Sequence, residues 1–386
     1  MNQEIKKTNT EEQQLQDQKY MRLALELAKK GCGHVNPNPM VGAVIVKDGR
    51  IIGQGYHEKY GELHAERNAL ASLTESAEGA TIYVTLEPCS HYGKQPPCCV
   101  ALAEHKLARV VIGSRDPNPL VSGRGVKYLR EHGTQVVEDV LRDECDAINE
   151  VFFYYIQNQL PYVVMKYAMT MDGKIAAYTG KSQWITGEEA RRNVHRDRNR
   201  YAAIMTGVGT VLKDDPMLNC RIEGGRNPVR IICDSSLRTP LYSRIVQTAR
   251  EIPTWIATCC EDKEKQKLYK DAGCEVLVIR PEDGRVDLQF LAMELGARKI
   301  DSVYLEGGAT LNWSALNSSI VKKVHTYIAP KLLGGSTAPT PVGGTGAEDP
   351  QHGWKLTNTK LTQLGDDILL ESDVEYEGRT ACLQES

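Results

Sequence analysis

Three side chains of the types that bind zinc stand close together in the first quarter of the chain. They are His64, in the sequence His64-Ala65-Glu66, and Cys89 and Cys98, each directly after a proline. Zinc is held tetrahedrally by histidine nitrogen and cysteine sulfur, and a catalytic zinc keeps one position for water. Glu66 can carry protons between such a water and a substrate. The pattern therefore predicts a catalytic zinc centre with Glu66 as its acid and base.

The arrangement of His-x-Glu followed by Pro-Cys is also the signature of zinc enzymes that deaminate nucleobases. A structural zinc would have four protein ligands, and Cys99 or His91 could supply the fourth. Cys99 could also replace Cys98, although Pro97-Cys98 mirrors Pro88-Cys89 and favours Cys98. A base-editing enzyme of nucleic acids and a zinc-binding regulator without activity are the alternative functions.

The two halves of the His64–Glu66 motif can act together only at a helix start. Residues two apart on a regular helix do not share a face, so we expect His64 to precede the first turn of a helix that reaches Leu73. A β-rich run over 81–86 ends just before Cys89. The sequence thus predicts that a helix start and a strand end bring the ligands to one edge of a sheet.

Composition and charge disfavour a nucleic-acid-binding, membrane-spanning or secreted protein. The 386 residues carry a net charge of -3, which disfavours a nucleic-acid partner. No apolar run approaches the roughly 18 residues of a membrane span, and the polar start, Met1 to Lys19, lacks the apolar core of a secretory signal. The 11 cysteines then suggest a cytoplasmic protein with reduced thiols, in which most are small core side chains.

Strand and helix patterns alternate along most of the chain, which is typical of an α/β fold. We expect a disordered polar segment over 1–17, a helix from Tyr20 to Lys30, and a first domain over 18–147. A second α/β domain is expected over 160–375, with a helix from Thr186 to Arg200 and a closing hairpin from Trp354 to Val374. Thr186 and Glu189 have the spacing of a capping box.

The second domain has no G-x-G-x-x-G fingerprint of a Rossmann fold. Two glycine-rich turns follow predicted strands instead, at Gly207-Val-Gly-Thr210 and Glu306-Gly307-Gly308. A strand-to-helix turn with free backbone N–H groups can bind phosphate. An ordinary tight turn is the alternative interpretation of both segments.

Longer motifs add a family resemblance. The insert from Cys89 to Cys98, with 36–42 and Gly55-Tyr56-His57, resembles the deaminase half of the bifunctional riboflavin-biosynthesis deaminase/reductases. The stretches 166–174, 182–186, 207–210, 214–216 and 305–308 resemble the reductase half of the same family. The resemblance implies a cytidine-deaminase-like three-layer domain followed by a dihydrofolate-reductase-like domain.

This resemblance also implies two consecutive reactions on a small pyrimidine nucleotide. Zinc-dependent hydrolysis would remove the 2-amino group of 2,5-diamino-6-(5-phosphoribosylamino)pyrimidin-4-one, and NADPH would then reduce the ribosyl side chain to ribityl. It further implies a homo-oligomer. In the first domain Asn38 and His57 would contact the pyrimidine. Lys94 would face the substrate, where a lysine suits the phosphate as a compact charge.

The resemblance assigns two further groups of residues in the second domain. The substrate would be bound by Lys166, Ser182, Arg198, Leu218, Arg221 and Glu306. NADPH would be bound by Ala168, Trp184, Thr186, Thr210, Asp214, Ser235, Gly308, Ala309, Thr310, Leu311 and Asn312. The two arginines, Arg198 and Arg221, suit a phosphate because guanidinium pairs with it bidentately.

Overall fold

The computed structural model describes residues 2–90, 96–118 and 122–376. Contacts divide the chain into two compact units, Met1–Asn158 and Gln159–Ser386. In the part of the chain that the structure describes, no helix is both long enough and apolar enough to cross a membrane.

The first unit is a five-stranded sheet in the order β2-β1-β3-β4-β5. The strands are β1 (Gly42–Lys47), β2 (Arg50–Tyr56), β3 (Thr81–Leu86), β4 (Arg109–Ser114) and β5 (Gln135–Val137). The hairpin β1–β2 turns at Asp48 and Gly49, which both have positive φ, as an Asp-Gly turn requires. The pairs β3–β4 and β4–β5 are parallel.

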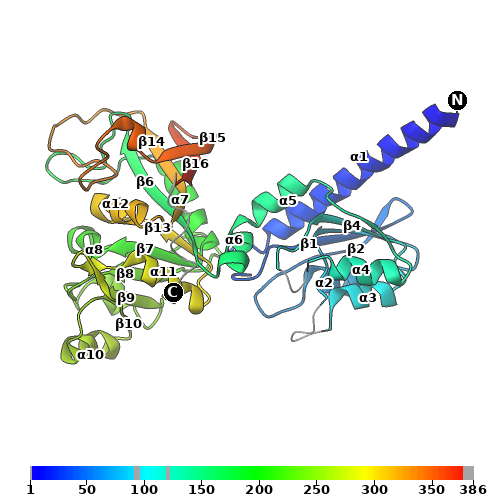
Figure 1. Ribbon diagram of the computed structural model, residues 1–386, viewed down its shortest axis with the longest axis horizontal. Coiled ribbons are helices and arrows are strands. Elements are labelled where there is room, and N and C mark those ends of the chain that lie inside the picture. Colours follow the sequence, from blue (N-terminus) through cyan, green and yellow to red (C-terminus); the bar gives the residue numbers. More distant parts are fainter. Residues whose placement is uncertain (1, 91–95, 119–121, 377–386) are drawn as a thin grey trace. The chain divides into compact units, whose positions relative to one another are not determined.

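Alternate residues of these strands bury opposite faces of the sheet, which gives three layers (Figure 1). Ile45, Ile82 and Val110 pack beneath one set of helices, and Val44, Tyr83 and Val111 pack beneath the other. The first set is α2 (Ala65–Ala71), α3 (Cys98–Glu104) and α4 (Arg124–Glu131). The second set includes α1 (Asn2–Lys29) and α5 (Arg142–Ile148), and α6 (Glu150–Asn158) ends the unit.

Helix α1 corrects the expectation of disorder over residues 1–17, because the helix begins at Asn2 rather than near Tyr20. The middle of this helix is tied to the sheet through Asp17, which is only 4% exposed. The Asp17 carboxylate accepts two hydrogen bonds from the Arg109 guanidinium, at 2.6 and 2.7 Å, and one from the Tyr83 hydroxyl. The sequence around Asp17 could not predict this contact, because Arg109 lies 92 residues away.

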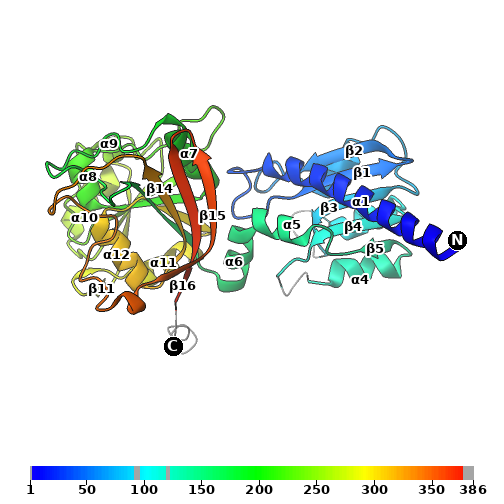
Figure 2. The ribbon, with the colours of Figure 1, turned by 90° about the horizontal axis from the view of Figure 1, so that it is seen from above.

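The second unit is built on a nine-stranded sheet in the order β10-β9-β8-β7-β13-β6-β14-β16-β15. All neighbours from β10 to β14 are parallel, and the hairpin β15–β16 adds two antiparallel strands, which lie beside β14 in Figure 2. The strands are β6 (Tyr162–Thr170), β7 (Ala203–Gly207), β8 (Val229–Cys233), β9 (Thr254–Thr258), β10 (Glu275–Val278), β13 (Ser302–Leu305), β14 (Val321–Ala329), β15 (Lys355–Leu364) and β16 (Asp367–Glu375). A separate two-stranded hairpin is made by β11 (Pro281–Glu282) and β12 (Arg285–Val286).

Helices cover both faces of this sheet. Met205, Ile231 and Leu305 pack with α11 (Leu288–Ala297) and α12 (Ala309–Asn317). Ile204, Ile232 and Ile256 point to the opposite face. That face packs with α8 (Val208–Asp214), α9 (Arg244–Gln247) and α10 (Lys263–Asp271), while α7 (Glu188–Arg200) leads into β7 and a short 3-10 turn (Pro350–His352) precedes β15. The α/β fold class and the closing hairpin agree with the sequence analysis.

The capping box expected at Thr186 and Glu189 is wrong. The residue before the first turn of α7 is Gly187, and no side chain caps that turn. The Gly187 N–H instead donates to the Asp367 carboxylate at 2.6 Å. A residue 180 positions away therefore satisfies the helix end that the local pattern assigned to Thr186.

Candidate functional site

In the first unit, the predicted zinc ligands meet where a strand ends and two helices begin. His64 is the extended residue directly before α2, Cys89 follows β3 and Pro88, and Cys98 is the first residue of α3. The ligand atoms of the three residues all lie within 4.8 Å of one another. The helix-start position predicted for His64 is confirmed, since Glu66 falls in the first turn of the helix that His64 precedes.

The spacing of these atoms fits a tetrahedral zinc. Nδ1 of His64 lies 3.5 Å from Sγ of Cys89 and 3.5 Å from Sγ of Cys98. Zinc–sulfur and zinc–nitrogen bonds of ordinary length at a tetrahedral angle separate sulfur from nitrogen by roughly 3.5 Å. The Cys98 N–H donates to Cys89 Sγ at 3.2 Å, which favours a thiolate there. The donor set and its geometry therefore fit the metal.

Among the described residues, the only cluster able to hold a metal consists of these three side chains. Cys99, the alternative ligand, is 1% exposed and packs in the apolar core, and its N–H donates to the Cys89 carbonyl. The other proposed fourth ligand, His91, and the proposed substrate contact, Lys94, lie outside the described residues. A set of three protein ligands is that of a catalytic zinc, which takes water as its fourth ligand.

Glu66 is buried beside the three ligands, with 4% of its surface exposed. Burial, followed by the negative charge of Cys89, raises the pKa of Glu66 to about 7. A carboxyl group with a pKa near neutrality can both accept and release a proton. Its place and its environment suit the role of acid and base that the sequence assigned to it.

Asn38 and His57 lie together next to this cluster. Asn38 Nδ2 is 3.1 Å from His57 Nε2, and the His57 ring meets the His64 ring edge to face with centroids 5.6 Å apart. His57 Nδ1 is 2.9 Å from the Leu63 carbonyl. Burial lowers the pKa of His57, so the ring is neutral, donates from Nδ1 and accepts from Asn38.

Two buried polar residues that the sequence analysis missed hold this site in place. Asn149 bonds both the N–H and the carbonyl of Met40, at 2.8 and 2.9 Å, and so fixes the segment that carries Asn38. Glu87, just before Pro88-Cys89, accepts from the N–H groups of Gly123 and Val126 at the start of α4. The signal for Glu87 was an acid at a strand end, but its backbone partners are distant in sequence.

In the second unit, a cavity of about 1030 Å³ lies at the carboxyl ends of β6, β13, β7 and β8. It is large for a ligand site, and it has room for a dinucleotide beside the reacting end of a substrate. Nearly all the residues that the resemblance assigned line it. They are Lys166, Ala168, Ser182, Trp184, Thr186, Arg198, Thr210, Asp214, Leu218, Arg221, Ser235, Glu306, Gly308, Ala309, Thr310 and Leu311.

Asn312 is the exception, because it is fully buried and does not line the cavity. Its Nδ2 donates to the Pro341 carbonyl at 2.9 Å. A Cβ on Gly307 would lie 2.6 Å from Asn312 Oδ1, so the turn before α12 needs glycine there. Asn312 thus supports the glycine turn from beneath, while Gly308 and the first residues of α12 face the cavity with a helix N-terminus.

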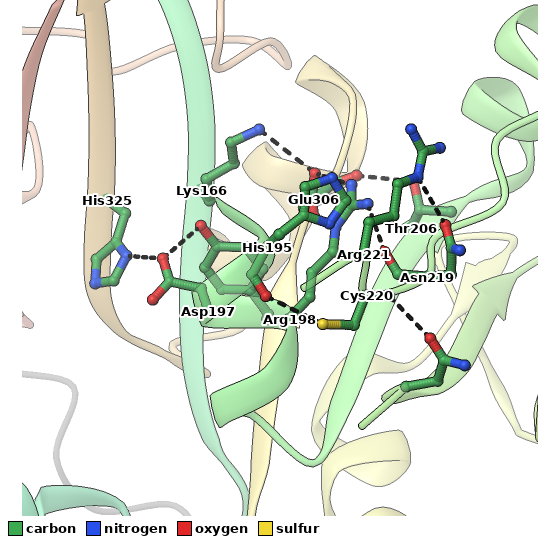
Figure 3. A network of polar contacts seen from close by, with 12 residues as sticks. Lys166, His195, Asp197, Arg198, Thr206, Asn219, Cys220, Arg221, Glu306 and His325 are labelled. Carbon is green, nitrogen blue, oxygen red and sulfur yellow. Dashed lines mark hydrogen bonds and ion pairs between the residues drawn. The ribbon is translucent and has the colours of Figure 1, made fainter. Parts of the chain in front are cut away.

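An ion cluster occupies the β6–β13 end of the cavity (Figure 3). Leu305 pairs with Met165 across the two strands, so the next residues, Glu306 and Lys166, fall side by side. The Glu306 carboxylate accepts from Arg198 Nε at 2.6 Å and Nη2 at 3.1 Å, and from Lys166 Nζ at 3.4 Å. Although burial raises it, these two cations lower the pKa of Glu306 to about 2.

The ion pair with Glu306 distinguishes the two arginines that were expected to bind phosphate, because only Arg198 takes part in it. Arg198 is committed to Glu306 and, through Nη1, to the Asn219 carbonyl at 3.0 Å. Arg221 is exposed, and within the described residues its guanidinium bonds only to Asn219 Oδ1, from Nε at 3.3 Å. His195 lines the cavity beside them, and burial together with both arginine charges lowers its pKa to about 4, so the ring is neutral. Arg221 is therefore the more available guanidinium.

A second buried network behind the cluster was not visible in the sequence. Asp197 Oδ2 accepts from the Tyr304 hydroxyl at 3.0 Å, from His325 Nδ1 at 3.2 Å and from the Tyr327 hydroxyl at 3.3 Å. The Tyr327 ring in turn lies 5.8 Å from Lys166 Nζ. Asp197 precedes Arg198 on α7, so this network fixes the helix from which Arg198 reaches Glu306 (Figure 3).

Family models match both units. Residues 14–114 match the cytidine and deoxycytidylate deaminase zinc-binding region, and residues 161–370 match the RibD C-terminal domain. The riboflavin biosynthesis protein RibD of Actinobacillus pleuropneumoniae is 55% identical over 92% of this chain and 94% of its own length. The same protein of Escherichia coli is 42% identical over 83% of this chain and 89% of its own length.

Solved structures agree over both units. A deaminase/reductase from Thermotoga maritima, described as acting on diaminohydroxyphosphoribosylaminopyrimidine and 5-amino-6-(5-phosphoribosylamino)uracil, is 38% identical with a TM-score of 0.82, covering 94% of this chain and 99% of its own. Acinetobacter baumannii RibD is 37% identical with a TM-score of 0.85, covering 94% and 100%. With its zinc-binding deaminase unit and its reductase unit, the chain belongs to the RibD family of bifunctional deaminase/reductases of riboflavin biosynthesis.

Proposed function

We propose that this chain deaminates 2,5-diamino-6-(5-phosphoribosylamino)pyrimidin-4-one and then reduces the ribosyl side chain of the product with NADPH, giving 5-amino-6-(5-phosphoribitylamino)uracil. One observation carries the proposal. A three-ligand zinc cluster with a buried glutamate and a dinucleotide-sized cavity with a Lys166–Glu306–Arg198 cluster occur in one chain. The substrates are those by which the Thermotoga maritima relative is named.

In the deamination step, water adds to the ring carbon that bears the amino group, a carbonyl replaces that group and ammonia leaves. Zinc supplies a Lewis acid that lowers the pKa of water toward neutrality. Glu66 takes one proton of the attacking water and passes it to the adjacent ring nitrogen. It then takes the proton of the new hydroxyl group and gives it to the departing amine as the carbonyl forms. Asn38 and His57 hold the pyrimidine, and Lys94 is proposed to meet the phosphoribosyl group.

In the reduction step, bound NADPH would supply a hydride to the ribosyl carbon attached to nitrogen. The bond from that carbon to the ring oxygen opens, and a proton added to this oxygen completes the open ribityl chain. Lys166, Ser182, Leu218 and Glu306 hold the sugar at the β6–β13 end of the cavity. Arg221, as the more available guanidinium, takes the phosphate, while Arg198 keeps Glu306 ionised. Of the predicted NADPH contacts, all but Asn312 remain in the proposal, and Asn312 acts only by supporting the glycine turn.

The test is to incubate the zinc-loaded protein with the diaminopyrimidine nucleotide and to follow the product by mass spectrometry, with and without NADPH. Without NADPH, the product should have oxygen in place of the amine, together with free ammonia. With NADPH, it should gain two further hydrogen atoms. Recovery of unchanged substrate in both arms would overturn the proposal.

Two further expectations belong to this proposal. A homo-oligomer is implied by the family resemblance, and sedimentation equilibrium of the full chain tests it, with a monomer as the contrary outcome. The cytoplasmic location expected from the cysteine content is tested by cell fractionation.

A further inference from the structure

The cavity of the second unit extends along the sheet edge well beyond the ion cluster. The strands β6, β13, β7 and β8 are neighbours in that order, and residues of all four line the cavity. Three steps at the strand spacing of about 4.8 Å separate the Lys166 end from the β8 end by roughly 14 Å. On the proposed function, a dinucleotide that meets the sugar at β6 and β13 extends its adenosine half toward β8.

Two arginines without a carboxylate partner stand at the β8 end. Arg238, in the loop after β8, and Arg285, on β12, both line the cavity and are both exposed. The Val286 N–H donates to Ser235 Oγ at 3.2 Å, which ties the β11–β12 hairpin to the β8 loop. Within the described residues, the Arg285 guanidinium contacts only the Ser314 hydroxyl, at 3.5 Å, and no salt bridge involves either arginine.

The acidic residue that directly follows β8, Asp234, is buried and faces away from the cavity. Proteins that select NAD place a carboxylate on the adenosine ribose hydroxyls, whereas an arginine accommodates the 2′-phosphate of NADP. Asp234 follows β8 directly, but it is fully buried and does not line the cavity. Its Oδ2 accepts from the N–H groups of Arg238 and Thr239, at 2.6 and 2.7 Å, and so shapes the loop that presents Arg238.

We propose that Arg238 and Arg285, on either side of Ser235, bind the 2′-phosphate of NADPH and determine the preference of the reductase for NADPH over NADH. Two guanidinium groups can each donate two parallel hydrogen bonds to one phosphate. The Ser235 hydroxyl accepts from the Val286 N–H and so keeps the hairpin that carries Arg285 beside the β8 loop. No residue at this end offers a carboxylate to the 2′-hydroxyl of NADH among those that line the cavity.

The test uses adenosine 2′,5′-bisphosphate and 5′-AMP as probes in calorimetric titrations of the full chain. The unmodified protein should bind the bisphosphate about 100-fold more tightly than AMP. Arg238→Gln and Arg285→Gln should each reduce that ratio about tenfold, and the double variant should bind the two probes alike. AMP affinity should stay nearly constant, because the lost contacts belong to the 2′-phosphate.

Arg244→Gln is the matched control. Arg244 lines the same cavity, but its guanidinium is bonded to the Asp215 carbonyl and pairs with the Asp215 carboxylate at 3.4 Å. Its loss should change the affinities for both probes by the same factor. A ratio unchanged in the Arg238 and Arg285 variants, or equally reduced in Arg244→Gln, overturns the inference, as does an unmodified protein that does not discriminate.

Thermal unfolding of each variant should show an intact fold, because both side chains are exposed. The probes need no turnover, so the inference and the proposed function fail separately. Discrimination without reduction of the sugar would remove the function and leave the phosphate site. Reduction with equal use of NADPH and NADH would do the reverse.

Discussion

The two sites of this chain are assembled in different ways. The zinc centre draws its ligands and its glutamate from a window of 35 residues, 64–98, at one strand end and two helix starts. The reductase cavity collects its lining from residues as far apart as Lys166 and Pro339. Because metal ligands must be few and close, a short motif can encode them. A dinucleotide and a sugar phosphate are held by many weak contacts, which a sheet edge gathers from distant segments.

Among the proposed substitutions, Glu66→Gln should produce the largest difference between the deaminase and reductase activities. Deamination should fall by about 10³-fold, since a positioned acid–base group contributes on that order, while zinc content stays unchanged. Reduction of substrate that has already been deaminated should proceed at the normal rate. Metal analysis and the two separate assays check this. Loss of both activities would show that the sites are not independent.

Glu306→Gln should lower the reductase activity and leave the deaminase activity unchanged. The change leaves Arg198 and Lys166 without their shared carboxylate in a site of low exposure, and breaking such a pair typically costs about 3 kcal/mol. We expect reduction to drop by roughly 10²-fold and the second unit to unfold earlier in urea, with deamination retained. Arg192→Gln, which removes an exposed ion pair with Glu188, is the control and should change little.

The pH dependence of unfolding tests the same ion cluster around Glu306. The pKa of Glu306 falls from 4.5 to about 2 on folding, so its stabilisation is fully present above pH 4.5 and is lost as the pH falls toward 2. The part of the free energy of unfolding that depends on Glu306 is on the order of 3 kcal/mol. Urea unfolding at pH 7 and pH 3 should therefore show a smaller acid-induced loss in Glu306→Gln than in the unmodified chain. Equal losses would contradict this.

The smallest effect is expected at Asp17→Asn. Asp17 ties α1 to the sheet through Arg109 and Tyr83, and its loss leaves a partly buried guanidinium unpaired. We expect the first unit to lose about 1–3 kcal/mol of stability, with zinc content and both activities intact. Lys29→Gln, near the end of the same helix and on its surface, is the control. A fall in zinc content would show that α1 also supports the metal centre.

The sequence predicts the features that depend on local spacing better than those that depend on distant residues. His64, Glu66 and Cys98 could be placed at helix starts from local spacing alone, and the structure agrees. The capping box at Thr186 and the disorder over 1–17 were wrong, because Asp367 and Arg109 act from far along the chain. The burial of Asn312 against the distant Pro341 carbonyl was not foreseen. The Asp197 network could not be found for the same reason, since three of its partners stand on two other strands.

Asn149 has a practical consequence for anyone who wishes to divide the two activities. It lies in the connector just before α6, yet both of its amide atoms are bonded to Met40 in the segment that carries Asn38. A shortened chain that stops at 147, where the first domain was predicted to end, would discard this clamp while keeping every zinc ligand. Such a fragment should hold metal and still bind pyrimidine poorly, whereas one that ends after Asn158 keeps both.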